Sequence, residues 1–181
     1  DALISKENVP PLPSAALSHI VPGFGTHEIE HKVLPCFPVK SDGLMRVSCQ
    51  TVRDLMKGHF DDRVSGFQIV DCRFAYEHEG GHIAGSINLN SIEQIQQHFL
   101  TPGSGLHAEH ALPPRTQSGY PDEQGSTRKF VLIFHCEFSF KRGPSLALAL
   151  RQAARSLSND YPNCHFPDMY ILQGGYAEFF R

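Results

Sequence analysis

Cys136 and Arg142 are the two residues whose types and spacing could do chemistry together, separated by residues 137–141. A thiolate can attack phosphorus, and the planar fork of a guanidinium matches two oxygens of a phosphate. The spacing therefore predicts covalent phosphoryl transfer. Cys136 would form a cysteinyl-phosphate that water then hydrolyses, while Arg142 and the intervening backbone N–H groups hold the charge of the transferred group.

The elements on either side of this pair place it on a tight loop. Residues 130–134 are a short apolar run, which is typical of a strand buried on both faces. After Gly143, apolar residues recur at helical spacing as far as Leu157, and Pro144 suits the first helical position. A loop that enters a helix N-terminus presents unpaired N–H groups and the positive end of the helix dipole, so it favours both an anion and a thiolate. The predicted phosphate-binding residues are Glu137, Phe138, Ser139, Phe140, Lys141 and Arg142.

An alternative is that Cys136 is an inert buried thiol, because free cysteine is among the most buried residue types. The flanking strand pattern, the preceding His135 and the Gly-Pro helix start favour the catalytic interpretation. We expect the His135 ring to order the loop and to support the thiolate, and we do not expect it to be the proton donor.

Three ordered stretches resemble one family. Residues 135–144 resemble the active-site loop of the M-phase inducer phosphatases, the dual-specificity enzymes that activate cyclin-dependent kinases. Residues 71–89 resemble that family's version of the rhodanese-domain signature, and residues 166–180 resemble its C-terminal block. The likeness runs from about residue 44 to residue 181. It implies the rhodanese-like topology, whereas the alternation of strands and helices by itself predicts only an α/β fold with a central parallel sheet flanked by helices.

The resemblance also implies a substrate and a setting. The substrate would be adjacent phosphothreonine and phosphotyrosine on a cyclin-dependent kinase–cyclin complex, so that activity promotes cell-cycle progression. The enzyme would be a monomer without cofactor or metal, located in nucleus and cytoplasm. The resemblance makes Glu137 the usual suggestion for the proton donor, although Lys141 stands where the family often has glutamate. A donor supplied by the phosphorylated partner is also possible.

Cys72 is a second cysteine of interest. It follows one predicted strand as Cys136 follows another, and parallel strands adjacent in the sheet would bring the two strand ends together. The resemblance implies a redox role, because the family carries a cysteine at the matching position that forms a disulfide with the catalytic one. The alternative is a buried structural thiol.

Three other functions compete with phosphatase activity. Rhodaneses are sulfurtransferases whose cysteine heads a loop one residue shorter, and related proteins use a Cys-x5-Arg loop to reduce arsenate. A non-catalytic rhodanese-like binding module is the third possibility, although such modules have typically lost the cysteine or the arginine, and Cys136 and Arg142 are both present.

Composition sets further limits. At 181 residues the chain is long enough for one domain, and a net charge of −3 gives no support for nucleic-acid binding. No apolar run approaches the roughly 20 residues of a membrane span, so we expect a soluble protein. No Cys-x-x-Cys pair suggests structural zinc. The odd number of cysteines, without close pairs, favours a reducing compartment. These cysteines are Cys36, Cys49, Cys72, Cys136 and Cys164.

Residues 1–43 are rich in turn formers and predict an extended N-terminal arm, with the catalytic domain at 44–181. Residues 27–31 match the zinc-protease pattern H-E-x-x-H. Gly25 and Pro35 confine any helix there, and no third ligand is identifiable, so we disfavour a zinc site. Residues 101–128 are rich in proline and glycine and predict a flexible insertion.

Within the predicted domain, a short helix should begin at the N-cap Ser48 and end near Gly58. Strands are expected at 67–71, 87–89 and 169–172, a helix at 92–99, and a last helical start at 174–176. The loop after residue 71 holds Glu77, Glu79 and His82, which we expect to brace the loop and not to touch substrate.

Overall fold

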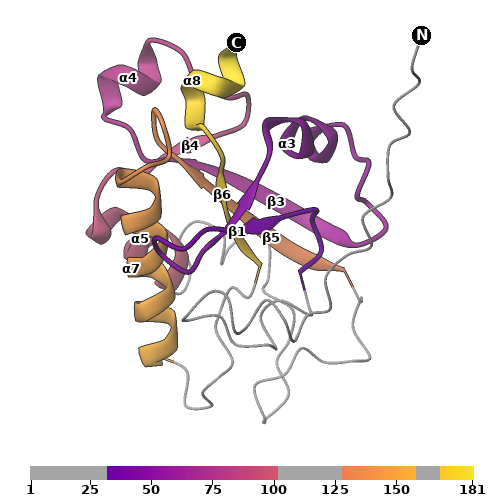
Figure 1. Cartoon of the computed structure of the whole chain (residues 1–181). Helices are drawn as coiled ribbons and strands as arrows, with labels where there is room; N and C mark the ends of the chain where they lie inside the picture. The colour runs from indigo at the N-terminus through magenta and orange to yellow at the C-terminus, as the bar shows by residue number, and fades with distance from the viewer. Residues whose placement is uncertain (1–31, 102–127, 158–167) are drawn as a thin grey trace, which may run out of the picture.

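The computed structural model describes residues 32–101, 128–157 and 168–181 (Figure 1). The H-E-x-x-H motif at residues 27–31 lies outside the described residues. So does the predicted insertion, except for its end residues 101 and 128. The strands are β1 Phe37–Pro38, β2 Met45–Val47, β3 Val64–Asp71, β4 Ile87–Asn88, β5 Lys129–His135 and β6 Met169–Leu172. The helices are α3 Cys49–Met56, α4 Ala75–Glu79, α5 Ile92–Leu100, α7 Arg142–Leu157 and α8 Gly175–Phe180.

The strands form one sheet in the order β1-β2-β6-β5-β3-β4. All described neighbours are parallel except β1 and β2, which are antiparallel. The predicted α/β fold with a central parallel sheet is therefore confirmed, with one antiparallel edge strand that the sequence did not reveal. β1 has two residues and ends in Pro38, which lacks an N–H for the ladder and so suits an edge.

β5 lies between β3 and β6 and is buried on both faces, as the apolar run predicted. Val131 and Ile133 pack in a core cluster with residues of α3 and with the partly buried Tyr176 and Phe179 of α8. Leu132 and Phe134 pack in a second cluster with residues of α5 and α7. Figure 1 shows the corresponding layers, with α5 and α7 on one side of the sheet and α3 on the other.

The predicted cap at Ser48 is confirmed, and the sequence carries a second serine cap, at Ser91, that was not predicted. The Ser48 hydroxyl accepts a hydrogen bond from the Thr51 N–H at the start of α3, and Ser91 caps α5 in the same way. One boundary was predicted wrongly, because α7 begins at Arg142, two residues before Pro144. The first-turn N–H groups of a helix have no intrahelical partner, so proline fits at the third helical position as well as at the first.

Besides β1, two elements were not predicted. β2 has only three residues and includes the buried, charged Arg46, so it lacks an apolar run. The five-residue helix α4 has no buried residue and therefore leaves no apolar stripe in the sequence. The described part of the predicted arm contributes β1 to the edge of the sheet and the buried Leu34 to the core cluster that contains Val131 and Ile133.

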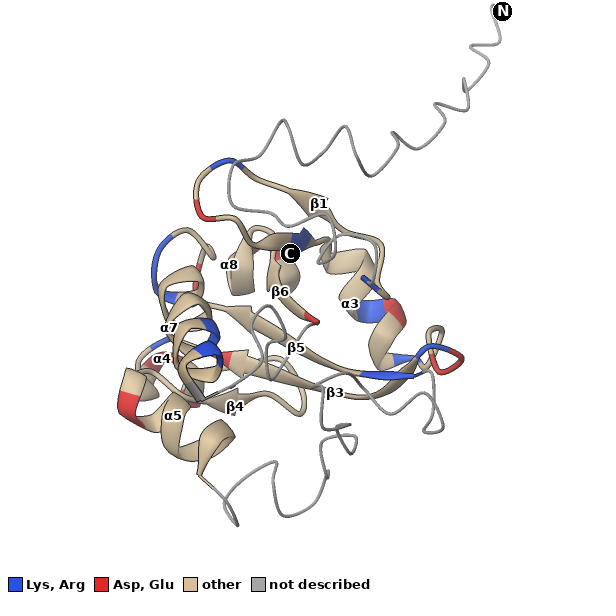
Figure 2. Cartoon of the chain, turned by 90° about the horizontal axis from the view of Figure 1, so that it is seen from below, with Lys and Arg blue, Asp and Glu red and all other residues tan. Residues whose placement is uncertain are grey.

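Charge is mixed over the described elements, and basic and acidic segments are interspersed (Figure 2). Within residues 32–101, 128–157 and 168–181, no helix is long and apolar enough to cross a membrane. In the same residues, no group of three or more His, Cys, Asp or Glu side chains could hold a metal ion.

Candidate active site

The loop from Cys136 to Lys141 connects the end of β5 to the start of α7. Position 143 favours glycine, because a Cβ there would lie 3.1 Å from the carbonyl carbon of His135, closer than most Cβ contacts. Ser139 has a φ of 52°, an uncommon value for a residue other than glycine. Its hydroxyl is buried and has no hydrogen-bond partner in the described part of the chain. Strain and an unpaired buried hydroxyl together are typical of a ligand site.

The N-terminus of α8 holds this loop from one side. The Tyr176 N–H donates to the Cys136 carbonyl at 3.0 Å, and the Ala177 N–H donates to the Glu137 carbonyl at 2.9 Å. Gly175, with a φ of +64°, makes this approach possible, because a Cβ there would lie 2.5 Å from both carbonyl oxygens. The turn that the sequence placed at residues 174–176 therefore orients the loop.

Arg142 lies in the first turn of α7, and its guanidinium binds Glu77. Its Nη1 donates to Glu77 Oε2 at 2.6 Å, and its Nη2 donates to Glu77 Oε1 at 3.1 Å. The hydrogen bonds to Glu77 raise the pKa of Arg142, and the nearby Cys136 adds a smaller effect of the same sign. Arg142 and Cys136, which the sequence paired, stand at the two ends of the same loop.

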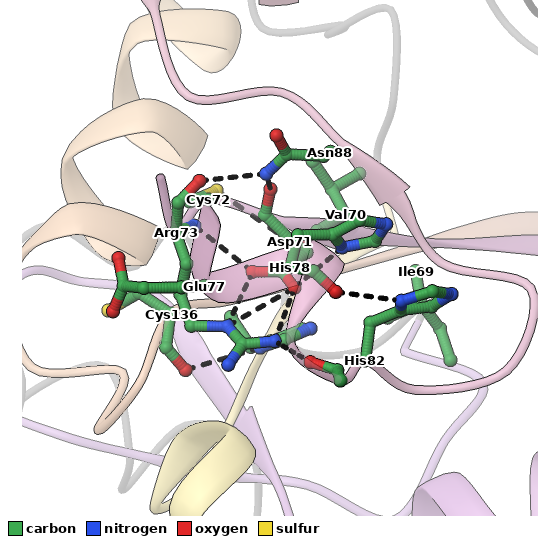
Figure 3. Close-up of polar contacts among 12 residues, drawn as sticks. Ile69, Val70, Asp71, Cys72, Arg73, Glu77, His78, His82, Asn88 and Cys136 are labelled. Carbon is green, nitrogen blue, oxygen red and sulfur yellow. Dashed lines mark hydrogen bonds and ion pairs between the residues drawn. The ribbon is translucent and has the colours of Figure 1, made fainter. Parts of the chain in front are cut away.

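A buried ion pair lies at the end of β3 (Figure 3). Arg73 Nε donates to Asp71 Oδ1 at 3.0 Å, and Nη2 donates to Oδ2 at 2.8 Å; the side chains are 3% and 0% exposed. Arg73 Nη2 also donates to the Gly81 carbonyl at 2.7 Å, and its guanidinium lies 3.9 Å from the centre of the Tyr176 ring. Burial alone would raise the pKa of Asp71, but hydrogen bonds from Arg73, the charge of His135 and a hydrogen bond from His78 lower it to about 2.

Arg73 also reaches the catalytic loop. Its Nη1 donates to Glu137 Oε2 at 3.2 Å, so the carboxylate predicted as proton donor faces a buried arginine. A pocket of ≈ 340 Å³ is lined in part by Lys141 of the loop, and Glu137 is not among its lining residues. The lining residues are Cys72, Phe74, Asn90, Lys141, Arg142, Ser145 and Leu146.

Cys72 and Cys136 stand at equivalent positions of neighbouring strands. Asp71 pairs with His135 in the parallel register of β3 and β5, and the Cys72 N–H donates to the His135 carbonyl at 2.8 Å. Both cysteines are buried and unbonded. Burial raises the pKa of the Cys72 thiol, and the negative charge of Cys136 raises it further.

His135 is fully buried, and its Nδ1 lies 3.2 Å from the Cys136 carbonyl oxygen. Burial lowers the pKa of His135, so its ring is neutral at pH 7. The ring also stacks on Tyr176. These contacts agree with the expected role of ordering the loop.

Residues 51–181 match the family model described as a rhodanese-like domain. The chain belongs to the rhodanese-like domain family. It is 40% identical over 149 residues to an M-phase inducer phosphatase of Drosophila melanogaster, covering 82% of this chain and 29% of that protein. It is 38% identical over 147 residues to the human M-phase inducer phosphatase 3, covering 81% of this chain and 27% of that protein.

The likeness of this rhodanese-like domain to M-phase inducer phosphatases, which the sequence motifs indicated, is therefore confirmed. The chain spans only about a quarter of the length of these relatives. Among solved structures, a yeast protein tyrosine phosphatase of the rhodanese family is 22% identical at a TM-score of 0.43, covering 74% of this chain and 83% of that chain. That likeness is too low to support an argument.

Sequence reasoning missed part of the rhodanese-like site. It placed Glu77 and His82 in a bracing loop, and the structure agrees, because Glu77 binds Arg142 and His82 Nδ1 lies 2.9 Å from the His78 carbonyl oxygen. It gave no role to Arg73, although an arginine two residues after an apolar strand that ends in aspartate was a signal of a buried ion pair. The predicted catalytic, phosphate-binding and redox roles stay predictions.

Proposed function

We propose that this chain is the catalytic domain of a cysteine-dependent protein phosphatase. The observation that carries the proposal is the placement of Cys136 directly after β5 and of Arg142 in the first turn of α7, at the two ends of one loop that is one residue longer than that of a sulfurtransferase. The relatives named as phosphatases support the same class of reaction. Neither feature is expected of a binding module that has lost its reacting groups.

The reaction would proceed in two steps. Cys136 Sγ attacks phosphorus in line with the leaving oxygen, so an S–P bond forms while the P–O bond to the substrate breaks. Water then breaks the S–P bond and releases phosphate. Arg142, the loop N–H groups and the unpaired Ser139 hydroxyl hold the equatorial oxygens, whose charge is best stabilised by donors fixed in advance.

The substrate we propose is phosphothreonine and phosphotyrosine on a cyclin-dependent kinase–cyclin complex. The names of the relatives support a cell-cycle role. The surface of the loop supports a protein substrate, because Phe138 and Phe140 are 67% and 89% exposed beside the reacting groups. Exposed aromatic side chains next to a shallow site are suited to contact a partner surface.

We also propose that the protein is a monomer and that it is located in nucleus and cytoplasm. Size-exclusion chromatography tests the first proposal, and imaging of the tagged protein tests the second.

The experiment that tests the reaction compares an aryl phosphate with thiosulfate and arsenate as substrates. We expect turnover of the aryl phosphate, and its loss in Cys136→Ser and Arg142→Lys, because neither a hydroxyl nor an ammonium replaces the thiolate and the planar fork. Cys49→Ser is the matched control, since Cys49 is buried in the core beside Gln173. Turnover of thiosulfate or arsenate alone would assign one of the competing functions, and half of the wild-type rate in Cys136→Ser would exclude the mechanism.

Glu137 is the proton donor that the resemblance suggests. If it protonates the leaving oxygen, Glu137→Gln slows substrates with poor leaving groups more than those with good ones. Its contact with Arg73 gives an alternative in which Glu137 only anchors the loop. Equal slowing across a series of aryl phosphates would establish the anchoring role.

We further propose that Cys72 protects Cys136 against oxidation. Peroxide would convert the Cys136 thiolate to a sulfenic acid, and the Cys72 sulfur would then attack it, release water and form a disulfide. Adjacent strands lie about 4.8 Å apart, within the Cα separation of about 4.4–6.8 Å that a disulfide requires. Wild-type activity lost to peroxide should return with dithiothreitol, and Cys72→Ser should recover less than Cys49→Ser. Equal recovery would leave Cys72 a packing residue.

A further inference from the structure

Glu77 binds Arg142, and the proposed reaction assigns it no role. Both of its carboxylate oxygens accept hydrogen bonds from the guanidinium, at 2.6 and 3.1 Å. Glu77 Oε2 also accepts from the Phe74 N–H at 2.9 Å. The carboxylate is therefore fixed to the backbone on one side and to the arginine on the other.

The helix that carries Glu77 is held by polar contacts. α4 has no buried residue, so packing contributes little to its position. Arg73, immediately before the helix, is bound to Asp71 and to the Gly81 carbonyl beyond it, and His78 Nδ1 lies 2.9 Å from Asp71 Oδ2. The buried carboxylate at the end of β3 thus anchors α4, and α4 in turn anchors Arg142.

The contact leaves the arginine free to bind a phosphate. Glu77 takes one N–H from each Nη atom, and the guanidinium has further N–H donors that remain for an incoming anion. The Phe74 ring lies 5.2 Å from the centre of the guanidinium and limits its movement on another side. The guanidinium of Arg142 is therefore held in one orientation and does not rotate to improve its contacts with a ground-state phosphate.

We propose that Glu77 is the positioning residue of Arg142. It lowers the affinity for the bound phosphate and raises the rate of the chemical step. Its negative charge opposes a phosphate dianion at the loop, and its bidentate contact keeps the guanidinium aimed at the position where equatorial charge develops. An enzyme accelerates the chemical step only by interactions that are stronger in the transition state than in the ground state. The inference rests on the proposed phosphatase function.

Two substitutions separate the effect of the charge of Glu77 from the effect of its side-chain length. Glu77→Gln removes the charge and one of the two accepting oxygens, so kcat on an aryl phosphate should fall by about tenfold or more. Tungstate should bind about tenfold more tightly, measured by calorimetry in a Cys136→Ser background. Glu77→Asp keeps the charge but is one methylene shorter, so kcat should fall while tungstate affinity stays within about twofold of the parent.

Glu79→Gln is the matched control, because it removes the same charge from the same helix at an exposed position. It should leave kcat and tungstate affinity unchanged. Thermal unfolding of every variant shows whether a loss of activity follows a loss of stability.

Each other outcome overturns the inference. Tighter tungstate binding in Glu77→Gln with unchanged or raised kcat would make Glu77 a competitor of the substrate and not a positioning residue. Weaker tungstate binding together with a lower melting temperature would make its role only structural, and unchanged constants would leave it no role. If wild type does not turn over an aryl phosphate, the proposed function fails, and the tungstate measurements still decide whether Glu77 controls the anion affinity of Arg142.

Discussion

Arg73→Met tests the ion pair that anchors both the catalytic loop and α4. Methionine keeps an unbranched side chain against the Tyr176 ring but removes the side-chain hydrogen bonds to Asp71, Glu137 and Gly81, and leaves only the backbone N–H of residue 73 bound to Asp71. Asp71 is then a fully buried carboxylate without its arginine. Removing one partner of a buried ion pair costs about 3–5 kcal/mol, so we expect a loss of about 3 kcal/mol in the free energy of unfolding.

The matched control is Arg63→Met. Arg63 pairs with Asp62 at 3.2 Å, but these side chains are 51% and 66% exposed, and exposed pairs contribute about 0–1 kcal/mol. Urea denaturation followed by circular dichroism measures the free energy of unfolding of both variants. In thermal unfolding, we expect the melting temperature of Arg73→Met to fall by roughly 6–12 °C. A loss below about 1 kcal/mol in Arg73→Met, or equal losses in the two variants, would refute the argument that burial makes the Asp71–Arg73 pair important.

Two further predictions follow from the same region. The folded pKa of Asp71, about 2, lies below the ordinary value of 3.8, so its stabilisation is complete above pH 3.8 and is lost as the pH falls toward 2. This contribution amounts to about 2 kcal/mol. Between about pH 2 and pH 3.8, the free energy of unfolding should therefore change less steeply with pH in Asp71→Asn than in wild type. Equal slopes would contradict the stabilising role of the Asp71 carboxylate. Gly175→Ala should reduce aryl phosphatase activity at least about tenfold, because its Cβ would collide with the loop carbonyls. Gly43→Ala has a similar φ of +68° and open space around it, so it should lose about 1 kcal/mol of stability and keep its activity; equal activities would refute the collision.

The central elements of the fold were predictable because they carry periodic apolar patterns. β5 is a continuous apolar run, and α3 and α5 follow serine caps that the sequence displays. β1, β2 and α4 were not predictable, because they are short and depend on pairing or polar contacts with residues distant in the chain. The start of α7 was misplaced because proline is compatible with more than one position in the first helical turn.

The same distinction applies to the candidate site. Cys136 and Arg142 could be paired from sequence because one loop and one helix start determine their separation. The contacts of Arg142 with Glu77 and of Arg73 with Glu137 join residues more than 60 positions apart, and no local pattern encodes them. The α/β order and the parallel strand ends could suggest only that these loops meet at one edge of the sheet.

The most direct test of the central claim is to trap the covalent intermediate. Wild-type protein is mixed with an aryl phosphate, quenched rapidly and digested, and the peptides are analysed by mass spectrometry under conditions that preserve an S–P bond. We predict a phosphoryl group on Cys136, absent from Cys136→Ser and present in Cys49→Ser. Turnover without any phosphorylated Cys136, or with the phosphoryl group on another residue, would contradict the mechanism.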